Sequence, residues 1–291
     1  MADITKALVV GSGAMGSQIA MVLSLAGLEV AVQDVAEQSL ERAKDELTAR
    51  MQRSVDKGRL TAEERDAAFA RMRFGTNLEE AAKGVDIAIE AAVEKVDIKR
   101  SLFAELDRLT PEHAILATNS SSFVPSKIAD ATGRPDRVVG MHFFNPALVM
   151  KCVEVVRGPQ TSHETTVATV ALAERVGKTP VVIEKEIPGF IANRLLNAVR
   201  DEAIRLLEGG YATVESIDTA ARTALGYPMG PFELMDLTGI DIGYYTKQAR
   251  YEETGDPADA PSRSVIDKVE RGELGRKTGK GWYDYTDEGE H

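Results

Sequence analysis

The segment VVGSGAMGSQIA, residues 9–20, decides the fold that we predict for this chain. Its three glycines follow an apolar, strand-like run and open a helix-like one. This arrangement is typical of a strand–turn–helix unit that binds a dinucleotide. Gly11 permits the tight turn, Gly13 lets the backbone approach a pyrophosphate, and Gly16 lets the helix pack closely on the sheet.

The residues around this turn predict which dinucleotide it binds. The turn would hold the pyrophosphate at the N-terminus of the helix, where free N–H groups favour an anion. The turn residues are Gly11, Ser12, Gly13, Ala14, Met15 and Gly16. Asp34 ends the next apolar run, and a carboxylate there suits a ribose 2′-hydroxyl and repels a 2′-phosphate. Because no arginine follows Asp34 within the next few residues, we expect NAD rather than NADP. We expect no metal ion. The plainer alternative is a glycine-rich turn without a ligand, which the flanking strand, helix and acidic residue disfavour.

Strand-like and helix-like stretches alternate along the first two thirds of the chain. We predict strands at residues 6–10, 28–33, 86–90, 114–118, 138–142, 153–156 and 180–183, and helices at 14–25, 39–57 and 62–72. This alternation predicts a mostly parallel sheet with helices on both faces. Further along, the pattern is helical only, with predicted helices at 190–208, 213–225, 232–251 and 264–270. The sequence therefore predicts an α/β domain of the Rossmann type at residues 1–185, with a helical hairpin insertion at about 37–72, and an all-α domain at 186–291.

Composition and charge exclude several classes of function. The chain has 291 residues, with 35 Lys and Arg against 46 Asp and Glu, and its net charge of −11 would repel a nucleic acid backbone. No window approaches the roughly 18 uninterrupted apolar residues of a membrane span, and the N-terminus lacks the features of a signal peptide. Cys152 is the single cysteine, so a disulfide within the chain is excluded. We therefore expect a cytoplasmic protein with neither a nucleic acid nor a membrane partner.

One histidine is a candidate catalytic base. Polar residues follow two predicted strands, at 118–122 and 140–146, and only His142 among the four histidines ends an apolar strand of the predicted nucleotide domain. Oxidation of an alcohol by NAD requires a base for the hydroxyl proton, and imidazole suits this because its pKa lies near neutral pH. Glu154, on the next predicted strand, is a candidate to orient the ring. These residues leave open the alternative of a core histidine bonded to the backbone.

Further polar residues at strand ends are candidates to contact the cofactor. Glu90 and Glu94 follow a predicted strand, and strand C-termini face the ligand crevice in a doubly wound sheet. Either carboxylate could contact the cofactor ribose or a lysine, Lys95 or Lys99. For Glu94, a solvated loop carboxylate is an equal alternative. The residues that we expect to contact NAD beyond the glycine turn and Asp34 are Glu90, Lys95, Asn119 and Asn145.

Several motifs distributed over the whole chain identify a family. They are VVGSGAMGSQIA, the Asn-Ser-Ser-Ser run at 119–122, GMHFFNPALVMKCVEVV, PGFIANRLLN, LGYPMGPFELMDLTGID and GRKTGKGWYDY. With them, the chain resembles the 3-hydroxyacyl-CoA dehydrogenases, closest to the bacterial 3-hydroxybutyryl-CoA type. The resemblance implies reversible, NAD-dependent oxidation of an (S)-3-hydroxyacyl-CoA with His142 as base and Glu154 as its orienter. It also implies that Ser121 and Asn193 bind the substrate oxygen, and that substrate binding draws the two domains together.

The CoA part of such a substrate carries phosphates and needs a local basic surface. Arg50, Arg53 and Lys57 fall on one face of a predicted helix, with Ser54 beside them. The resemblance implies that this helical hairpin contacts CoA, so we expect these four residues to receive its nucleotide part. For any one of them, an ordinary charge on a solvated helix face is the alternative.

The resemblance also implies a homodimer formed through the all-α domain. Met229, Phe232, Leu234 and Met235 make an apolar cluster there, and closed dimers are the commonest partner for such helix faces. These residues could equally fill an internal core of a single chain.

Two other functions are compatible with a Rossmann domain followed by helices. One is a dehydrogenase of a free 3-hydroxy acid. Some 3-hydroxy-acid dehydrogenases use a lysine four residues before an Asn on the long helix. This mechanism is disfavoured here because Gly189 is the residue four before Asn193. A relative that acts on a free sugar acid stays possible and would not need the basic helix face. The other is a non-catalytic NAD-binding protein, because a fold alone does not prove activity. The set of His142, Glu154, Ser121 and Asn193 argues against this second function.

Overall fold

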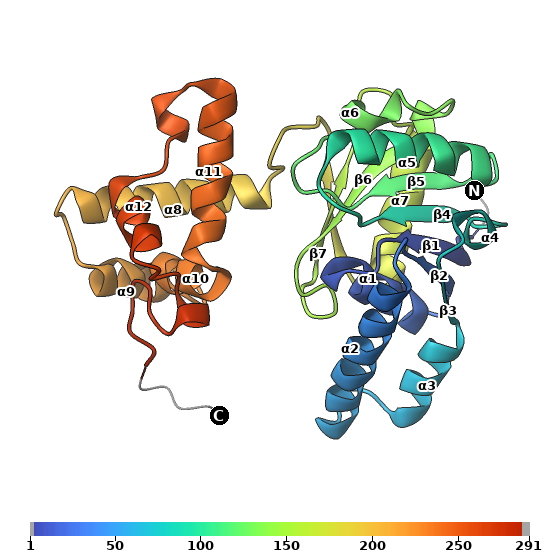
Figure 1. Ribbon diagram of the computed structural model, residues 1–291, viewed down its shortest axis with the longest axis horizontal. Coiled ribbons are helices and arrows are strands. Elements are labelled where there is room, and N and C mark those ends of the chain that lie inside the picture. Colours follow the sequence, from blue (N-terminus) through green and yellow to red (C-terminus); the bar gives the residue numbers. More distant parts are fainter. Residues whose placement is uncertain (1–2, 287–291) are drawn as a thin grey trace. The chain divides into compact units, whose positions relative to one another are not determined.

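An eight-stranded sheet forms the centre of the N-terminal part of the computed structural model, which describes residues 3–286 (Figure 1). Its strands are β1 (Lys6–Val10), β2 (Glu29–Gln33), β3 (Met72–Gly75), β4 (Ile87–Glu90), β5 (Ile115–Thr118), β6 (Val138–Phe143), β7 (Cys152–Val156) and β8 (Thr179–Ile183). They lie in the order β3-β2-β1-β4-β5-β6-β7-β8. All neighbours run parallel except β6 and β7, which are antiparallel. The predicted, mostly parallel sheet is confirmed.

Helices cover both faces of this sheet because successive strand residues bury their side chains on opposite faces. The helices are α1 (Ala14–Leu25), α2 (Glu37–Asp56), α3 (Ala62–Ala70), α4 (Leu78–Ala81), α5 (Val96–Leu109), α6 (Ser126–Ala129) and α7 (His163–Arg175). Val9 and Ile89 share one apolar cluster with α1 and α7, whereas Leu8 and Ala88 share another with α5 and α6. Figure 1 shows α5 and α6 together on one side of the sheet.

Helices α2 and α3 form the predicted helical hairpin, which extends past the sheet in Figure 1. Leu40, Leu47 and Met51 bury one face of α2, and a capping box at Thr61 begins α3. The predicted helix at 62–72 is too long by two residues. Met72–Gly75 instead forms the edge strand β3, paired with β2.

The C-terminal part of the chain is helical, as predicted. Its helices are α8 (Ala192–Glu208), α9 (Val214–Leu225), α10 (Pro231–Thr238), α11 (Ile240–Thr254) and α12 (Arg263–Glu270). The prediction of a single helix at 232–251 is wrong, because Gly239 separates α10 from α11 with a φ of 98°, outside the helical range. An apolar cluster around Phe232 and Met235 forms the core of this part. Within residues 3–286, no helix combines the length and the apolar character that crossing a membrane requires.

Two buried aspartates bind residues 282–283 to these helices. Asp236 accepts hydrogen bonds from the N–H groups of Trp282 and Tyr283, each at 2.9 Å. Asp218 accepts one from the Tyr283 hydroxyl at 2.9 Å and another from the Phe232 N–H at 2.9 Å. Buried carboxylates are tolerated only when donors satisfy them in this way. Residues 282–283 are therefore part of the packing of the helical unit.

The chain divides into two compact units, Met1–Ile191 and Ala192–His291. This division falls a few residues after the expected boundary at residue 185, because Phe190 still packs in the first unit and is fully buried. Its cluster consists of Val124, Val156, Ile183 and Phe190. The φ of Phe190 is 51°, in the left-handed region, which costs a residue with a Cβ about 1–2 kcal/mol. Strain of this kind persists only where the surrounding packing imposes it, and it is found most often at functional sites.

Candidate active site

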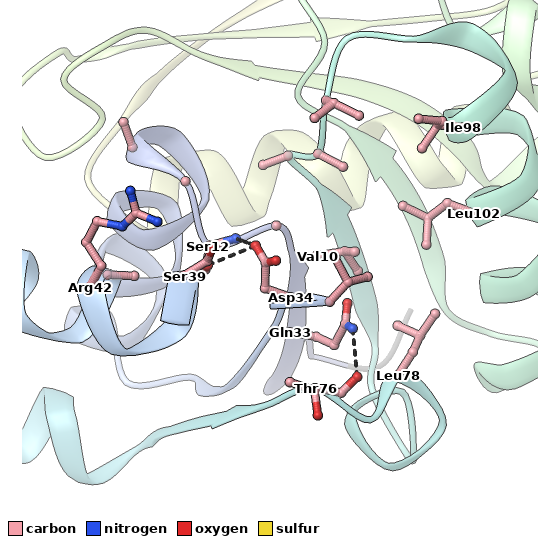
Figure 2. Close-up of a pocket in the computed structure, with 18 of the residues that line it drawn as sticks. Val10, Ser12, Gln33, Asp34, Ser39, Arg42, Thr76, Leu78, Ile98 and Leu102 are labelled. Atoms are coloured by element: carbon pink, nitrogen blue, oxygen red, sulfur yellow. Dashed lines mark hydrogen bonds between the residues drawn. The ribbon is translucent and has the colours of Figure 1, made fainter. Parts of the chain in front are cut away.

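A cavity of about 1140 Å³ opens where β1, β2 and β4 end (Figure 2). The glycine turn contributes Gly11, Ser12, Gly13 and Ala14 to its lining, and the end of β2 contributes Asp34. The cavity therefore lies at the carboxyl edge of the sheet, where open α/β sheets bind their ligands. Its size suits a cofactor.

The three glycines of the turn differ in what a side chain at each position would meet. A Cβ on Gly16 would lie 1.9 Å from the Gly11 carbonyl oxygen, and a Cβ on Gly11 would lie 2.5 Å from that of Ala91. Both glycines thus serve close packing inside the protein. A Cβ on Gly13 would meet nothing within 4 Å. Gly13 is the N-cap of α1 and has no side chain to occupy the first N–H groups of the helix, so this end of α1 suits the phosphates of a dinucleotide.

Asp34 is held in place from the turn. Its Oδ2 accepts hydrogen bonds from the N–H and the hydroxyl of Ser12, both at 2.8 Å, and its Oδ1 accepts one from the Ala36 N–H at 3.2 Å. Burial alone would raise the pKa of Asp34, but the hydrogen bonds from Ser12 and Ala36 outweigh it and hold the pKa below its usual value. Asp34 is therefore a fixed carboxylate that remains charged near neutral pH.

An arginine that sequence reasoning missed lines the same cavity. Ser39 and Arg42 lie one turn apart on α2 and both border the space beside Asp34 (Figure 2). Arg42 lies eight residues after Asp34, beyond the few residues in which an arginine would indicate NADP. The predicted helix that begins at residue 39 carried the signal, because residues three apart share a helix face.

The other expected cofactor residues surround this edge of the sheet. Met15 is half-buried and Gly16 buried in the first turn of α1, and Glu90 is buried at the end of β4. Lys95 is the exposed N-cap of α5, and Asn145 is exposed after β6.

A histidine–carboxylate pair stands on the two antiparallel strands. The register of β6 and β7 places His142 directly opposite Glu154, so both side chains point to one face. His142 Nδ1 lies 2.9 Å from Glu154 Oε2, and the side chains are only 7% and 1% exposed. Donation from Nδ1–H to the carboxylate makes Nε2 the acceptor nitrogen of the neutral ring. This geometry suits a base that is oriented by an anion.

Two aromatic rings and a backbone N–H enclose this pair. The ring centroid of His142 lies 4.5 Å from that of Phe144 and 5.4 Å from that of Phe190. The Ile191 N–H donates to Glu154 Oε1 at 3.0 Å. Sequence reasoning missed these contacts of Phe190 and Ile191 because they depend on the positive φ of Phe190, which no residue pattern indicates.

The loop after β5 is fixed beside His142 by hydrogen bonds. The Asn119 side-chain oxygen accepts the Phe143 N–H at 2.8 Å, which joins the ends of β5 and β6. The buried Ser120 hydroxyl donates to Glu94 and accepts the N–H of Phe123 at 2.9 Å. Ser121 lies between these anchors and is half-buried. The hydrogen bonds of Asn119 and Ser120 therefore restrict the backbone that leads into Ser121.

A buried lysine joins two carboxylates at this same edge. Lys99, on α5, is 1% exposed, and its Nζ lies 2.6 Å from Glu90 and 2.9 Å from Glu94. Glu90 also accepts the Thr118 hydroxyl at 2.7 Å. Burial raises the pKa of Glu94, but the hydrogen bonds from Ser120 and Lys99 outweigh this and lower it. The sequence left Lys95 and Lys99 as possible partners of these carboxylates, and Lys99 makes the ion pairs.

The remaining expected residues lie elsewhere. Asn193 is the second residue of α8, in the second unit, and is half-buried. Arg50, Arg53 and Ser54 lie in the last turns of α2, and Lys57 is its C-cap. Arg53 and Lys57 are exposed, as a surface for a large anion requires.

Comparison with known proteins assigns the family. The model of the 3-hydroxyacyl-CoA dehydrogenase NAD binding domain matches residues 6–187, and that of the C-terminal domain of the same family matches residues 189–285. The chain is 40% identical over 283 residues to a probable 3-hydroxybutyryl-CoA dehydrogenase of Bacillus subtilis, covering 97% of this chain and 98% of that protein. It is 39% identical to the mitochondrial hydroxyacyl-coenzyme A dehydrogenase of Homo sapiens, covering 95% of this chain and 90% of the human protein.

Solved structures agree with this assignment. The crystal structure of (S)-3-hydroxybutyryl-CoA dehydrogenase from Ralstonia eutropha superposes with a TM-score of 0.89 at 37% identity and covers 97% of this chain and 99% of that one. The family models together span nearly the whole chain. The chain belongs to the 3-hydroxyacyl-CoA dehydrogenase family of oxidoreductases.

Proposed function

We propose that this protein oxidises the 3-hydroxyl of a short-chain (S)-3-hydroxyacyl-CoA, such as 3-hydroxybutyryl-CoA, to the 3-oxoacyl-CoA, reversibly and with NAD. One observation carries the proposal: the buried His142–Glu154 pair stands at the edge of the sheet that also opens into the dinucleotide cavity. The names of the relatives support the choice of substrate.

The proposed mechanism assigns a role to each polar side chain. Bound NAD would supply the acceptor for the hydride that leaves C3 of the substrate. His142 takes the hydroxyl proton on Nε2, and Glu154 stabilises the imidazolium that forms. Ser121 and Asn193 hold the substrate oxygen at hydrogen-bond distance from the base. The glycine turn and Asp34 bind the dinucleotide, with Lys95, Asn119 and Asn145 beside it. Glu90, expected to contact the cofactor, is fully buried and instead supports this part of the sheet through its ion pair with Lys99.

A substrate panel tests this function. Formation of NADH is measured with 3-hydroxyacyl-CoAs of increasing chain length, with NADP in parallel, and with free 3-hydroxy acids. Activity confined to the free acids would favour the sugar-acid alternative. NADH binding without turnover of any substrate in the panel would favour a non-catalytic protein.

Cofactor choice depends on Asp34 in this proposal. Asp34→Ala is expected to raise the KM for NAD about tenfold and to make NADP usable, because it removes the charge that repels a 2′-phosphate and leaves Arg42 in the cavity. Steady-state kcat/KM with each cofactor measures this. The double variant Asp34→Ala/Arg42→Ala should lose the activity gained with NADP. Unaltered NAD kinetics in the single variant would contradict the role of Asp34.

The end of α2 is the proposed CoA surface. Arg53→Glu/Lys57→Glu is expected to raise the KM for acyl-CoA about tenfold and leave NAD affinity unchanged, because both side chains are exposed and positive. The matched control, Lys83→Glu/Arg108→Glu, reverses two exposed charges elsewhere in the same unit. The same acyl-CoA KM in both double variants would remove the claim.

We further propose that the protein acts in the cytoplasm as a homodimer formed through its second unit. Exposed apolar side chains on α8, α10 and α11 support this, and they include Leu195, Leu237, Ile242 and Tyr245. A light-scattering mass equal to one chain at working concentration would reject the dimer.

A further inference from the structure

We propose that the turn at residues 189–191 is a positioning element of the catalytic pair: the Ile191 N–H fixes Glu154, and the Phe190 ring fixes the face of His142. The inference rests on the proposed function, in which His142 is the base. It assigns a role in the reaction to residues that touch neither substrate nor cofactor in the proposed mechanism.

The first part of the argument is the geometry of Glu154. One carboxylate oxygen, Oε2, lies 2.9 Å from His142 Nδ1, and the other, Oε1, accepts the Ile191 N–H at 3.0 Å. The terminal bond of a carboxylate side chain has a broad torsional preference, so its rotation is limited chiefly by hydrogen bonds to the two oxygens. The Ile191 N–H restricts that rotation. It thereby fixes the direction in which Glu154 holds the imidazole.

The second part is the backbone that aims this N–H. Gly189 and Phe190 both have positive φ, 78° and 51°. Glycine adopts this conformation freely, but phenylalanine does not. The Phe190 side chain is fully buried among Val124, Val156 and Ile183, so packing holds the turn in a conformation that its own backbone disfavours. The direction of the next N–H therefore depends on the burial of one aromatic ring.

The third part is the contact between rings. The Phe190 ring lies 5.4 Å from the His142 ring, and Phe144 lies 4.5 Å from the same ring. Rings at these separations restrict the rotation of the imidazole and help to keep water from it. Phe190 thus acts on His142 directly by packing, and on Glu154 through the turn. Because α8 begins at Ala192, the same turn also leads the chain into the helix that carries Asn193.

A purely structural role would predict a different result from a positioning role. If Phe190 only filled the core, its loss would lower stability and leave the turnover of folded protein unchanged. If the turn positions the pair, kcat falls in folded protein while the KM for NAD stays constant, and the magnetic environment of the His142 ring changes. The experiment must therefore separate folding from turnover.

The sharpest test replaces Ile191 by its α-hydroxy acid analogue, which turns the backbone N–H into an ester oxygen and keeps the side chain. We expect kcat to fall roughly tenfold, with the KM for NAD unchanged. The Nδ1–H resonance of His142 in protein with ¹⁵N-labelled histidine should move. The matched control is the same ester at Val176, which removes a 3.0 Å bond to the Leu172 carbonyl at the end of α7. This control should leave both readouts at their wild-type values.

Two side-chain variants keep the proposal testable if the ester at residue 191 impairs folding. Phe190→Leu keeps an apolar side chain, and Phe190→Gly keeps the backbone conformation but loses the ring. Both are expected to lower kcat in folded protein, and Phe190→Gly should lower it more. Wild-type kcat and an unmoved His142 resonance in either the ester variant or both Phe190 variants would overturn the inference. His142→Gln distinguishes failure of this inference from failure of the proposed function. If His142→Gln is inactive while the turn variants behave as wild type, the proposed function stands and this inference fails.

Discussion

Replacing His142 with glutamine is expected to lower kcat by about three orders of magnitude and to leave NADH affinity close to that of the wild type. A positioned general base contributes about 10²–10⁴-fold to the rate. Glutamine keeps a polar side chain of similar size but cannot accept the substrate proton and hold it as a cation. The cavity for the dinucleotide is lined by residues from β1, β2, α2 and α5 and from the loop after β4, so NADH affinity should not depend on residue 142 on β6. Initial rates with 3-hydroxybutyryl-CoA and NADH fluorescence titration measure the two quantities.

His163→Gln is the matched control for this variant. His163 is exposed at the first residue of α7, so its replacement should leave kcat unchanged. The kcat of Glu154→Gln should lie between those of His142→Gln and His163→Gln, because an amide can still bond to the ring but does not stabilise the imidazolium. Wild-type kcat in His142→Gln would show that the base lies elsewhere.

The second large effect concerns stability. Lys99→Met is expected to lower the free energy of unfolding by about 3–5 kcal/mol, the usual cost of removing one partner from a buried ion pair. Glu90 has no solvent exposure and would keep an unpaired charge, whereas Glu94 is 39% exposed and would recover part of its solvation from water. Most of the loss should therefore come from Glu90. Urea denaturation followed by circular dichroism gives the value.

Two variants frame this prediction. Lys83→Met, at an exposed position, controls for the loss of a lysine. Glu90→Gln/Lys99→Met removes both charges and should recover much of the stability, because a neutral amide costs less to bury than an unpaired carboxylate. A change below about 1 kcal/mol in Lys99→Met would mean that water reaches Glu90 and that the pair is not buried in solution.

The sheet and the first helix could be predicted because their signals are local. The strands in the middle of the sheet are continuous apolar runs, and the glycine turn carries its own geometry. Strand β3 could not be predicted, since only Met72 of its four residues is buried. Helix α5 was not predicted, although Phe103 and Leu106 recur at helical spacing on its buried face. The same face buries Lys99, which no apolar pattern indicates. The ion pairs that make this burial possible exist only in the folded structure.

The candidate site also contains residues that could be predicted from the sequence and others that could not. His142 and Glu154 could be chosen from the sequence because each stands on a predicted strand, although the register that pairs them became visible only in the sheet. Ser120 and Glu94 could not be paired, since they come from loops after different strands. The turn at Phe190 was hidden for a different reason: a positive φ at a bulky residue arises from tertiary packing and leaves no mark on composition or spacing.

The hydrogen bonds that Asp218 and Asp236 accept have a consequence for folding during synthesis. The donors that satisfy these two carboxylates include Trp282 and Tyr283, which follow the carboxylates that they bind by 46 to 65 residues. Until those residues leave the ribosome, the helical unit has a core that contains carboxylates without their full set of donors. During synthesis the first unit can complete its sheet earlier, whereas the second can complete its core only once Trp282 and Tyr283 have emerged.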